Sequence, residues 1–332
     1  MQVPEFWAEA REEGKVNGKR RVVRRFGWSE TSQLEADALA LLRAREALQD
    51  LQQGKQVAAR ERKAGYGERG LPIREEVVAR SNSMVVTRNA YGARCLNEPD
   101  VLFADVDVEV VLDARIERAF VLASRATLLL GIATAVVLLV LNGKLLAIPT
   151  FFVALVLAWR IRAVRDRLRE RPGVREAARD SARSRIERAV AAMPGARFAL
   201  YESPAGFRVL ALHAKADPRS AATRSCFQAF GTDPCYAQMC ELQACFRARV
   251  SAKPWRIGVQ KNVPPRNGTW PVKPVHLPRR TAWIDDYEQK AAGFAACRYL
   301  EDFGTGGIDP RCAEVQRAHD AMAQARTQLP LA

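Results

Sequence analysis

Two uncharged apolar runs in the middle of the chain constrain its fold more than any other feature. The first run covers residues 126–141 and the second covers residues 145–159, so they contain sixteen and fifteen residues. The residues between them are Asn142, Gly143 and Lys144, which favour a tight turn and include a charge that prefers water. The pattern predicts two antiparallel helices, each apolar around its whole circumference.

The length of these runs fits a membrane hairpin if the flanking residues contribute. At 1.5 Å per residue each run spans roughly 22–24 Å, whereas the hydrocarbon core of a bilayer is about 30 Å thick. The helices can extend further if Arg125 and Arg160 reach the headgroups along their aliphatic stems. A hairpin that crosses the bilayer and one that dips into it both stay open. A buried helical hairpin of a soluble protein is the alternative.

Arginines flank the hairpin on both outer sides. Three precede the first run, namely Arg115, Arg118 and Arg125, and six follow the second, namely Arg160, Arg162, Arg165, Arg167, Arg169 and Arg171. Because basic flanks stay in the cytoplasm, we expect both termini there. Residues 1–14 lack the apolar segment of a cleavable signal. We therefore expect a membrane protein with a transmembrane hairpin over residues 119–161.

The net charge of +15 has more than one explanation. Arginine supplies 42 of the 52 basic residues, which a high-GC coding bias also produces. Residues 160–188 hold eleven arginines and five acidic residues, so lipid headgroups account for much of the excess. The basic residues left to bind a polyanionic ligand are Arg88, Arg94, Arg208, Arg247, Arg249, Lys253 and Arg256.

The remaining segments predict an α+β fold with a mixed or antiparallel sheet and flanking helices, interrupted by the hairpin. We expect an N-terminal strand–helix unit with a connector over 1–83, a first part of the α+β domain over 84–118, the hairpin over 119–161, an Arg-rich juxtamembrane helix over 162–194, and a second part of the domain over 195–332.

Hydrophobic periodicity and turn residues locate the individual elements. Strands are expected over 20–28, 84–87, 101–108, 197–202, 207–213 and 246–251. Helices are expected over 33–53, 73–80, 159–192, 218–230, 234–245, 284–303 and 309–328. The helix over 33–53 is expected to bury a stripe formed by Leu34, Leu41, Leu42, Ala44, Leu48 and Leu51.

The pattern that most strongly indicates a catalytic or metal site is the strand Val101 to Val108, which contains Asp105 and Asp107. Residues two apart share one face of a strand, so the two carboxylates would project side by side. They repel each other unless a cation lies between them, which suits Mg²⁺ or Mn²⁺ held with substrate phosphates. A strand end at which both acids meet solvent is the alternative.

This Asp-x-Asp strand resembles the first motif of archaeo-eukaryotic-type primase and primase-polymerase palms. The segment from Tyr201 to Leu210, with its Ser203-Pro204-Ala205-Gly206 turn, is similar to their second motif, although Arg208 stands where those proteins carry a His. Ile284-Asp285 is the candidate third motif. The resemblance implies that Asp105 and Asp107 bind the catalytic metals and that Arg208 binds the triphosphate.

Two other segments suit an anionic ligand. On the strand over 246–251, alternation places Arg247 and Arg249 on one face, and Lys253-Pro254-Trp255-Arg256 then sets an aromatic ring between cations. The polar loop from Arg88 to Arg94 forms a second candidate contact. A solvated arginine face is the alternative for Arg247 and Arg249, and a solvated helix turn is expected for Arg74-Glu75-Glu76.

Other motifs are weak. Gly65 to Gly70 match the glycine spacing of a dinucleotide-binding loop, but no strand precedes them. The spacing of Cys235, Cys240 and Cys245 does not converge on a zinc ion, which favours buried thiols.

Two functions are therefore expected. The first is a membrane-anchored, primase-like protein that acts on nucleotides or nucleic acid, either as a binding protein or as a metal-dependent nucleotidyltransferase. The second is a non-catalytic, membrane-anchored interaction module that binds a protein or anionic lipid through its basic cytoplasmic domain.

Overall fold

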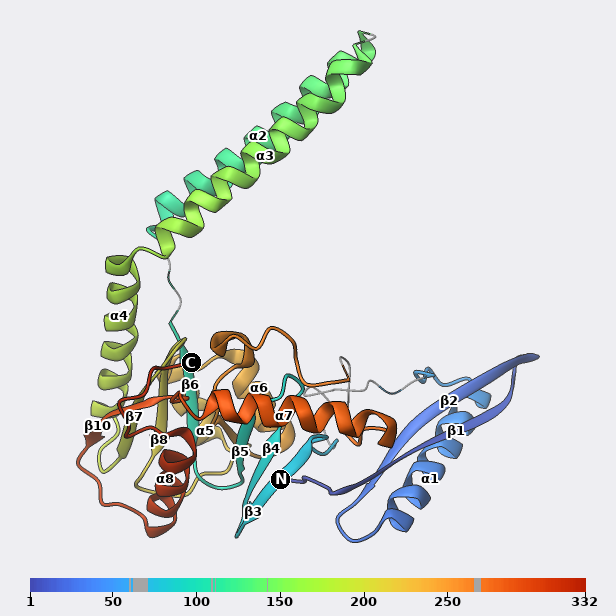
Figure 1. Ribbon diagram of the computed structural model, residues 1–332, viewed down its shortest axis with the longest axis vertical. Helices are drawn as coiled ribbons and strands as arrows, with labels where there is room; N and C mark the ends of the chain where they lie inside the picture. The colour runs from blue at the N-terminus through green and yellow to red at the C-terminus, as the bar shows by residue number, and fades with distance from the viewer. Residues whose placement is uncertain (60, 62–70, 109, 111, 142, 266–269) are drawn as a thin grey trace. The chain divides into compact units, whose positions relative to one another are not determined.

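The chain forms two compact units. The computed structural model describes residues 1–59, 61, 71–108, 110, 112–141, 143–265 and 270–332 (Figure 1). One unit, here the α+β unit, comprises Met1–Val106 and Ile186–Ala332, and the other, here the hairpin unit, comprises Asp107–Arg185. The hairpin unit thus interrupts the sequence of the α+β unit.

Two four-stranded sheets form the centre of the α+β unit. The first has the order β10-β7-β8-β6 and the second the order β3-β4-β5-β9. The strands are β3 (Glu76–Ser81), β4 (Met84–Arg88), β5 (Arg94–Glu98), β6 (Phe103–Asp107), β7 (Arg197–Ser203), β8 (Gly206–Ala211), β9 (Phe246–Arg249) and β10 (Arg298–Gly304). The pairs β10–β7, β7–β8, β3–β4, β4–β5 and β5–β9 are antiparallel. The predicted α+β class with antiparallel sheets is confirmed.

The helices of the α+β unit are α5 (Ala221–Phe230), α6 (Pro234–Gln243), α7 (Leu277–Ala291) and α8 (Pro310–Ala323). Short 3-10 turns, η1 (Pro254–Ile257) and η2 (Pro274–His276), lie between β9 and α7. The helix α4 (Pro172–Ala191) connects the two units in sequence. The predicted helices over 218–230, 234–245 and 309–328 are confirmed.

The N-terminal segment forms a two-stranded sheet, β1 (Phe6–Val16) and β2 (Lys19–Ser29), which packs on α1 (Gln33–Gln52). The predicted strand and helix are confirmed. Of the predicted stripe Ala44 is buried, but Leu34 is 79% and Leu42 53% exposed. The buried residues of the helix are Ala36, Ala40, Ala44 and Ala47. At Gly27 even a Cβ atom would lie 2.2 Å from the Ala36 carbonyl oxygen, so the approach requires small residues on both sides.

Three other predictions are wrong. The helix expected over 73–80 is the strand β3, and the end of the helix expected over 284–303 is the strand β10. Both are edge strands, where charged residues meet solvent and the strand alternation is weak. The helix expected over 159–192 is broken at Pro172-Gly173, where α4 begins, because proline starts a helix readily but interrupts one in its interior.

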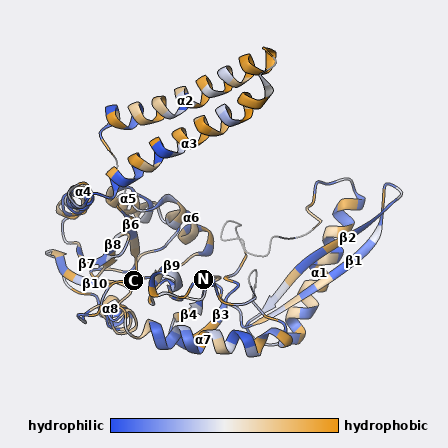
Figure 2. Cartoon of the chain, turned by 45° about the horizontal axis from the view of Figure 1, so that its top comes forward, coloured by the Kyte–Doolittle hydropathy of each residue, from blue (hydrophilic) through white to orange (hydrophobic). Residues whose placement is uncertain are grey.

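The hairpin unit consists mainly of α2 (Ala114–Val140) and α3 (Lys144–Arg169), which pack side by side along their length (Figure 1). At 1.5 Å per residue each helix is roughly 40 Å long. Small residues on one line of each helix are buried, namely Ser124, Gly131 and Ala135 on α2 and Ala147, Ala154 and Ala158 on α3. Figure 2 shows hydrophobic residues around both helices, with hydrophilic residues gathered at the end away from the turn.

Large apolar side chains of the hairpin unit point outward. They include Leu122, Leu129, Leu130, Val137, Leu145, Ile148, Phe152 and Val156, all of which are exposed. The helices approach closely at Gly131, where an added Cβ atom would lie 2.1 Å from the Ala154 Cβ atom. The hairpin therefore has small residues inside and large apolar residues outside.

Replacing Gly131 with Leu should force α2 and α3 apart. The longer side chain has no space against Ala154, and such overpacking costs roughly 1–3 kcal/mol. Spin labels on Ala133→Cys and Phe152→Cys, in a Cys235→Ser background, should report a longer interhelical distance by electron–electron resonance. The control Ala126→Leu changes an exposed alanine of the same helix and should leave that distance unchanged. An unchanged distance in Gly131→Leu would refute the close packing.

Candidate functional site

Asp105 forms an ion pair with Arg208. Asp105 lies on β6 and Arg208 on the neighbouring strand β8. The Arg208 Nε atom donates to Asp105 Oδ1 at 2.8 Å, and Nη2 donates to Oδ2 at 3.4 Å. Only 2% of Arg208 is exposed. The guanidinium therefore occupies the position beside Asp105 at which the sequence predicts a metal ion.

The rest of the Arg208 side chain is also engaged within the α+β unit. Its Nη1 atom donates to the Arg249 carbonyl oxygen at 2.9 Å and lies 3.2 Å from His319 Nε2. His319 is fully buried, and its Nδ1 lies 3.1 Å from an oxygen of Asp320. Burial disfavours the charge, but the Asp105 carboxylate outweighs burial and raises the pKa of Arg208. Arg208 is thus a permanently charged, internally paired group.

Asp107 lies at the end of β6 and is exposed. It shares the strand parity of Asp105, but the two carboxylates differ, since Asp105 is half-buried and paired with Arg208. Within the described residues no group of three or more His, Cys, Asp or Glu side chains is arranged to hold a metal ion. Metal binding by Asp105 and Asp107 stays a prediction.

The loop cations Arg88 and Arg94 are paired with Glu288 of α7. Arg88 is buried, with Nη2 at 2.9 Å from Glu288 Oε1 and Nη1 donating to the Gly92 carbonyl oxygen at 2.8 Å. Arg94 Nε lies 3.4 Å from Glu288 Oε2. The loop between them is fixed by Asn89, whose Oδ1 accepts from three successive amides, those of Tyr91, Gly92 and Ala93. These arginines bind helix α7 to the sheet.

The arginine face predicted for β9 is not solvated. Arg247 is buried, and its Nη2 donates to Glu75 Oε2 at 2.5 Å. Glu75 is also buried and accepts from the Thr87 hydroxyl at 2.6 Å, so the expected solvated turn at 74–76 is wrong as well. Arg249 Nη1 donates to the carbonyl oxygens of Ser251 and Ala332, at 2.7 and 3.3 Å. Both arginines satisfy buried or half-buried acceptors.

The 88–94 loop and the 253–256 segment meet at one surface. Trp255 of η1 is 51% exposed, and its ring centroid lies 5.1 Å from that of Tyr91 in an edge-on arrangement. The Lys253 ammonium nitrogen lies 5.6 Å from the Trp255 ring centroid. Arg256 is half-buried in the same turn. Of the predicted ligand-binding segments, these two come together around an exposed aromatic ring.

The pairing of these arginines with their acidic partners was not predicted from the sequence. Glu75 and Arg247 are 172 residues apart, and Asp105 and Arg208 are 103 residues apart. No local spacing signals such a pair. His319 and Cys297, whose sulfur lies 3.7 Å from His319 Nε2, were missed for the same reason. Ile284 and Asp285, the candidate third motif, lie within helix α7.

The predicted cysteine cluster falls within the described residues. Cys240 and Cys245 are buried, as expected, whereas Cys235 is exposed. Burial raises the pKa of the Cys245 thiol to about 12, so it stays protonated. The glycine pattern from Gly65 to Gly70 lies outside the described residues.

Comparisons of the chain with protein-family models, with curated proteins and with solved structures find no match. Any function must therefore be argued from the geometry alone.

Glu98 on β5 is a buried acid whose shifted pKa should make the stability of the fold depend on pH. It is fully buried and paired with Arg311 Nη2 at 2.6 Å. Burial, only partly offset by Arg311, raises the Glu98 pKa from 4.5 to about 7. The pKa of Glu98 is higher in the folded chain than in the unfolded chain, so the protonated carboxyl group stabilises the fold. This contribution to the free energy of unfolding is complete below pH 4.5 and is lost as the pH rises through 7.

Urea unfolding of the full chain in detergent should therefore show stability falling between pH 4.5 and 7, by a few kcal/mol at most. Glu98→Gln should remove this component of the pH dependence. A Glu98→Gln profile parallel to that of the wild type would contradict the shifted pKa.

Proposed function

We propose that the chain is an integral membrane protein whose α2–α3 hairpin anchors the α+β unit at the cytoplasmic surface. We further propose that the α+β unit is a binding module and not a metal-dependent nucleotidyltransferase. The observation that carries the anchor is the packing of the hairpin. Its small residues face each other, and only 17% of each 18-residue apolar window is buried.

This packing distinguishes the two kinds of hairpin considered for the apolar runs. A soluble helical hairpin buries its large apolar side chains, because their transfer from water drives folding. In a bilayer the lipid tails are as apolar as leucine, so helices associate through small residues that permit close backbone approach. Gly131 against Ala154, with leucine, valine and phenylalanine outside, fits the second case.

The charged residues favour a hairpin that crosses the bilayer. Gly131 faces Ala154, so Arg125 and Arg160, each six residues further from the turn, lie at about the same level. From that level to the turn the apolar zone is roughly 24 Å long, and snorkelling arginines extend it toward 30 Å. A lysine left at the bilayer centre costs about 2.5–3.5 kcal/mol. That cost favours placing the turn with Lys144 at the far headgroups, with both termini in the cytoplasm.

The binding role of the α+β unit is supported by the Asp105–Arg208 pair. A nucleotidyltransferase needs carboxylates free to hold metal ions, but Arg208 already neutralises Asp105 through two donors. The arginines at positions 88, 94, 247 and 249 likewise contact acids or carbonyl oxygens of the same unit. Much of the basic character of this unit therefore stabilises its own fold.

The membrane anchor is tested by alkaline carbonate extraction combined with protease protection of the full chain. We expect the protein to remain in the membrane pellet, with both termini cleaved by protease added from the cytoplasmic side. Complete release into the carbonate supernatant would refute integral insertion. Protection of one terminus only would refute the hairpin topology.

Binding of nucleotides or single-stranded nucleic acid is a second candidate, favoured by the exposed Trp255 ring beside Tyr91 and Lys253. Stacking of a base on an aromatic ring contributes roughly 1–3 kcal/mol. Trp255→Ala should therefore weaken binding of a labelled oligonucleotide about fivefold to 150-fold, whereas Trp255→Phe should retain most of the affinity. The assay should include Mg²⁺ and a salt series. An affinity that changes neither with salt concentration nor in Trp255→Ala would exclude this candidate.

A further inference from the structure

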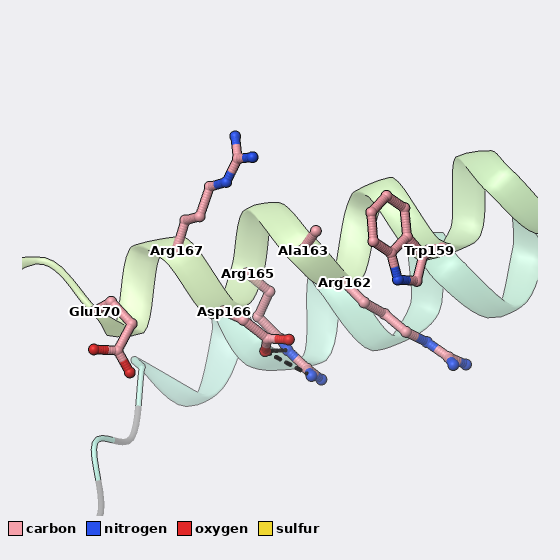
Figure 3. Close-up of a pocket in the computed structure, with 7 residues that line it drawn as sticks. All are labelled: Trp159, Arg162, Ala163, Arg165, Asp166, Arg167 and Glu170. Carbon is pink, nitrogen blue, oxygen red and sulfur yellow. Dashed lines mark hydrogen bonds and ion pairs between the residues drawn. The ribbon is translucent and has the colours of Figure 1, made fainter. Parts of the chain in front are cut away.

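A groove of about 560 Å³ lies on α3 just beyond the apolar run. Its lining residues are Trp159, Arg162, Ala163, Arg165, Asp166, Arg167 and Glu170. Figure 3 shows Trp159, Ala163 and Arg167 projecting from one side of the helix, with Arg162 extending from the other side. All seven belong to the hairpin unit. The small side chain of Ala163 leaves space between the indole and the Arg167 guanidinium.

Most charges of the groove are paired. Arg165 binds Asp166 at 2.9 Å, and Glu170 binds Arg175 at 2.9 Å. Both acids of the groove, Asp166 and Glu170, are therefore paired with an arginine. Arg162 and Arg167, in contrast, make no ion pair with any residue that the structure describes. The groove thus offers two uncompensated guanidinium groups and no uncompensated carboxylate.

Trp159 fixes the depth of the groove relative to a bilayer. Its side chain is 64% exposed, and it directly follows the exposed apolar residues Leu155, Val156 and Leu157. Indole rings gather at the headgroup level, where one end meets apolar chains and the other meets water. Arg162 and Arg167 lie about one to two turns beyond the indole, which places them at headgroup depth.

We infer that this groove binds the phosphate headgroup of an anionic phospholipid. The inference rests on the proposed membrane anchor. Arg162 and Arg167 project from opposite sides of α3 (Figure 3), so the phosphate binds to Arg167, which lies on the side of Trp159 and Ala163. The acyl chains lie against Trp159 and the apolar face before it. A zwitterionic headgroup would bring a choline or ethanolamine cation toward Arg167 with no carboxylate left to receive it.

The test uses the full-length protein, reconstituted in vesicles of phosphatidylcholine and phosphatidylglycerol and then extracted in mild detergent. The ratio of the two lipids that co-purify is measured by mass spectrometry. Wild type should be enriched in phosphatidylglycerol over the vesicle composition. Arg167→Gln should reduce that enrichment roughly tenfold or more, because it removes the charge-assisted hydrogen bonds to the phosphate.

A matched control removes the same charge outside the groove. Arg115 of α2 is exposed and lies at the same end of the hairpin as the groove, so Arg115→Gln should retain the enrichment. Trp159→Ala should lower it and Trp159→Phe should retain it. Equal loss in the α2 control, or no enrichment in wild type, would overturn the site and indicate diffuse surface electrostatics.

Two further measurements separate this inference from the membrane anchor and from recognition of phosphate alone. Carbonate extraction of each variant reports insertion, so an inserted protein without lipid preference refutes the headgroup site and leaves the anchor intact. Inorganic phosphate at millimolar concentration should not displace the co-purifying phosphatidylglycerol. Displacement by inorganic phosphate would overturn the assignment to a lipid.

Discussion

Four lysines on the outer face of the hairpin should release the protein from membranes. The variant carries Leu130→Lys, Val137→Lys, Ile148→Lys and Val156→Lys, all at exposed positions that leave the small-residue interface intact. A lysine costs about 2.5–3.5 kcal/mol at the bilayer centre and less toward its edges, so the four together oppose insertion of two short apolar runs by several kcal/mol. Flotation in a density gradient should find wild type with the lipid and the variant at the bottom.

The matched control places four lysines on exposed apolar residues of the α+β unit, with Leu34→Lys, Leu42→Lys, Val78→Lys and Ile308→Lys. These side chains already face solvent, so this variant should float with the lipid. Flotation separates true insertion from aggregation, because aggregated protein sediments. A hairpin variant that floats as wild type does would exclude the membrane-embedded outer face.

Removing the Asp105 carboxylate should strongly destabilise the α+β unit. Asp105→Asn leaves the Arg208 guanidinium buried without a counterion, which costs about 3–5 kcal/mol. Combining Asp105→Leu with Arg208→Met removes both charges and should recover most of the loss. Urea unfolding followed by tryptophan fluorescence measures these differences.

Asp107→Asn is the control for this experiment. The residue is exposed, so its replacement should change the free energy of unfolding by less than about 0.5 kcal/mol. A metal site gives a different result. There, both Asp105→Asn and Asp107→Asn would abolish Mg²⁺-dependent nucleotide binding, and Asp105→Asn would leave the apoprotein as stable as wild type. That outcome would restore the nucleotidyltransferase hypothesis.

The sequence predicts the apolar hairpin because its signal is local and one-dimensional. Sixteen and fifteen residues without charge identify two helices wherever the rest of the chain lies. The same holds for the β7–β8 hairpin, where Ser203-Pro204-Ala205-Gly206 forms the expected turn and the Ser203 hydroxyl accepts from the Gly206 amide at 3.1 Å. These elements follow from neighbouring residues.

The electrostatic partners do not follow from neighbouring residues. Alternation correctly places Arg247 in a strand, but only the fold brings Glu75 against it. The pairing of Asp105 with Arg208 likewise depends on the fold, which places β8 beside β6. Edge strands such as β10 are missed because their acidic residues, including Glu301 and Asp302, match the surface of a helix as well as that of a sheet edge.

The insertion of the hairpin between β6 and β7 determines the order of events on the ribosome. Strand β6 pairs with β8, which is synthesised only after the whole hairpin unit, so the sheet cannot close earlier. Asp105 precedes Arg208 by 103 residues, a delay of roughly 5–20 s at ordinary rates of translation. The apolar helices therefore leave the ribosome while the first half of the sheet is still open. The hairpin unit is therefore complete before the sheet is, and a nascent chain stalled within the hairpin would present β6 as an unpaired edge.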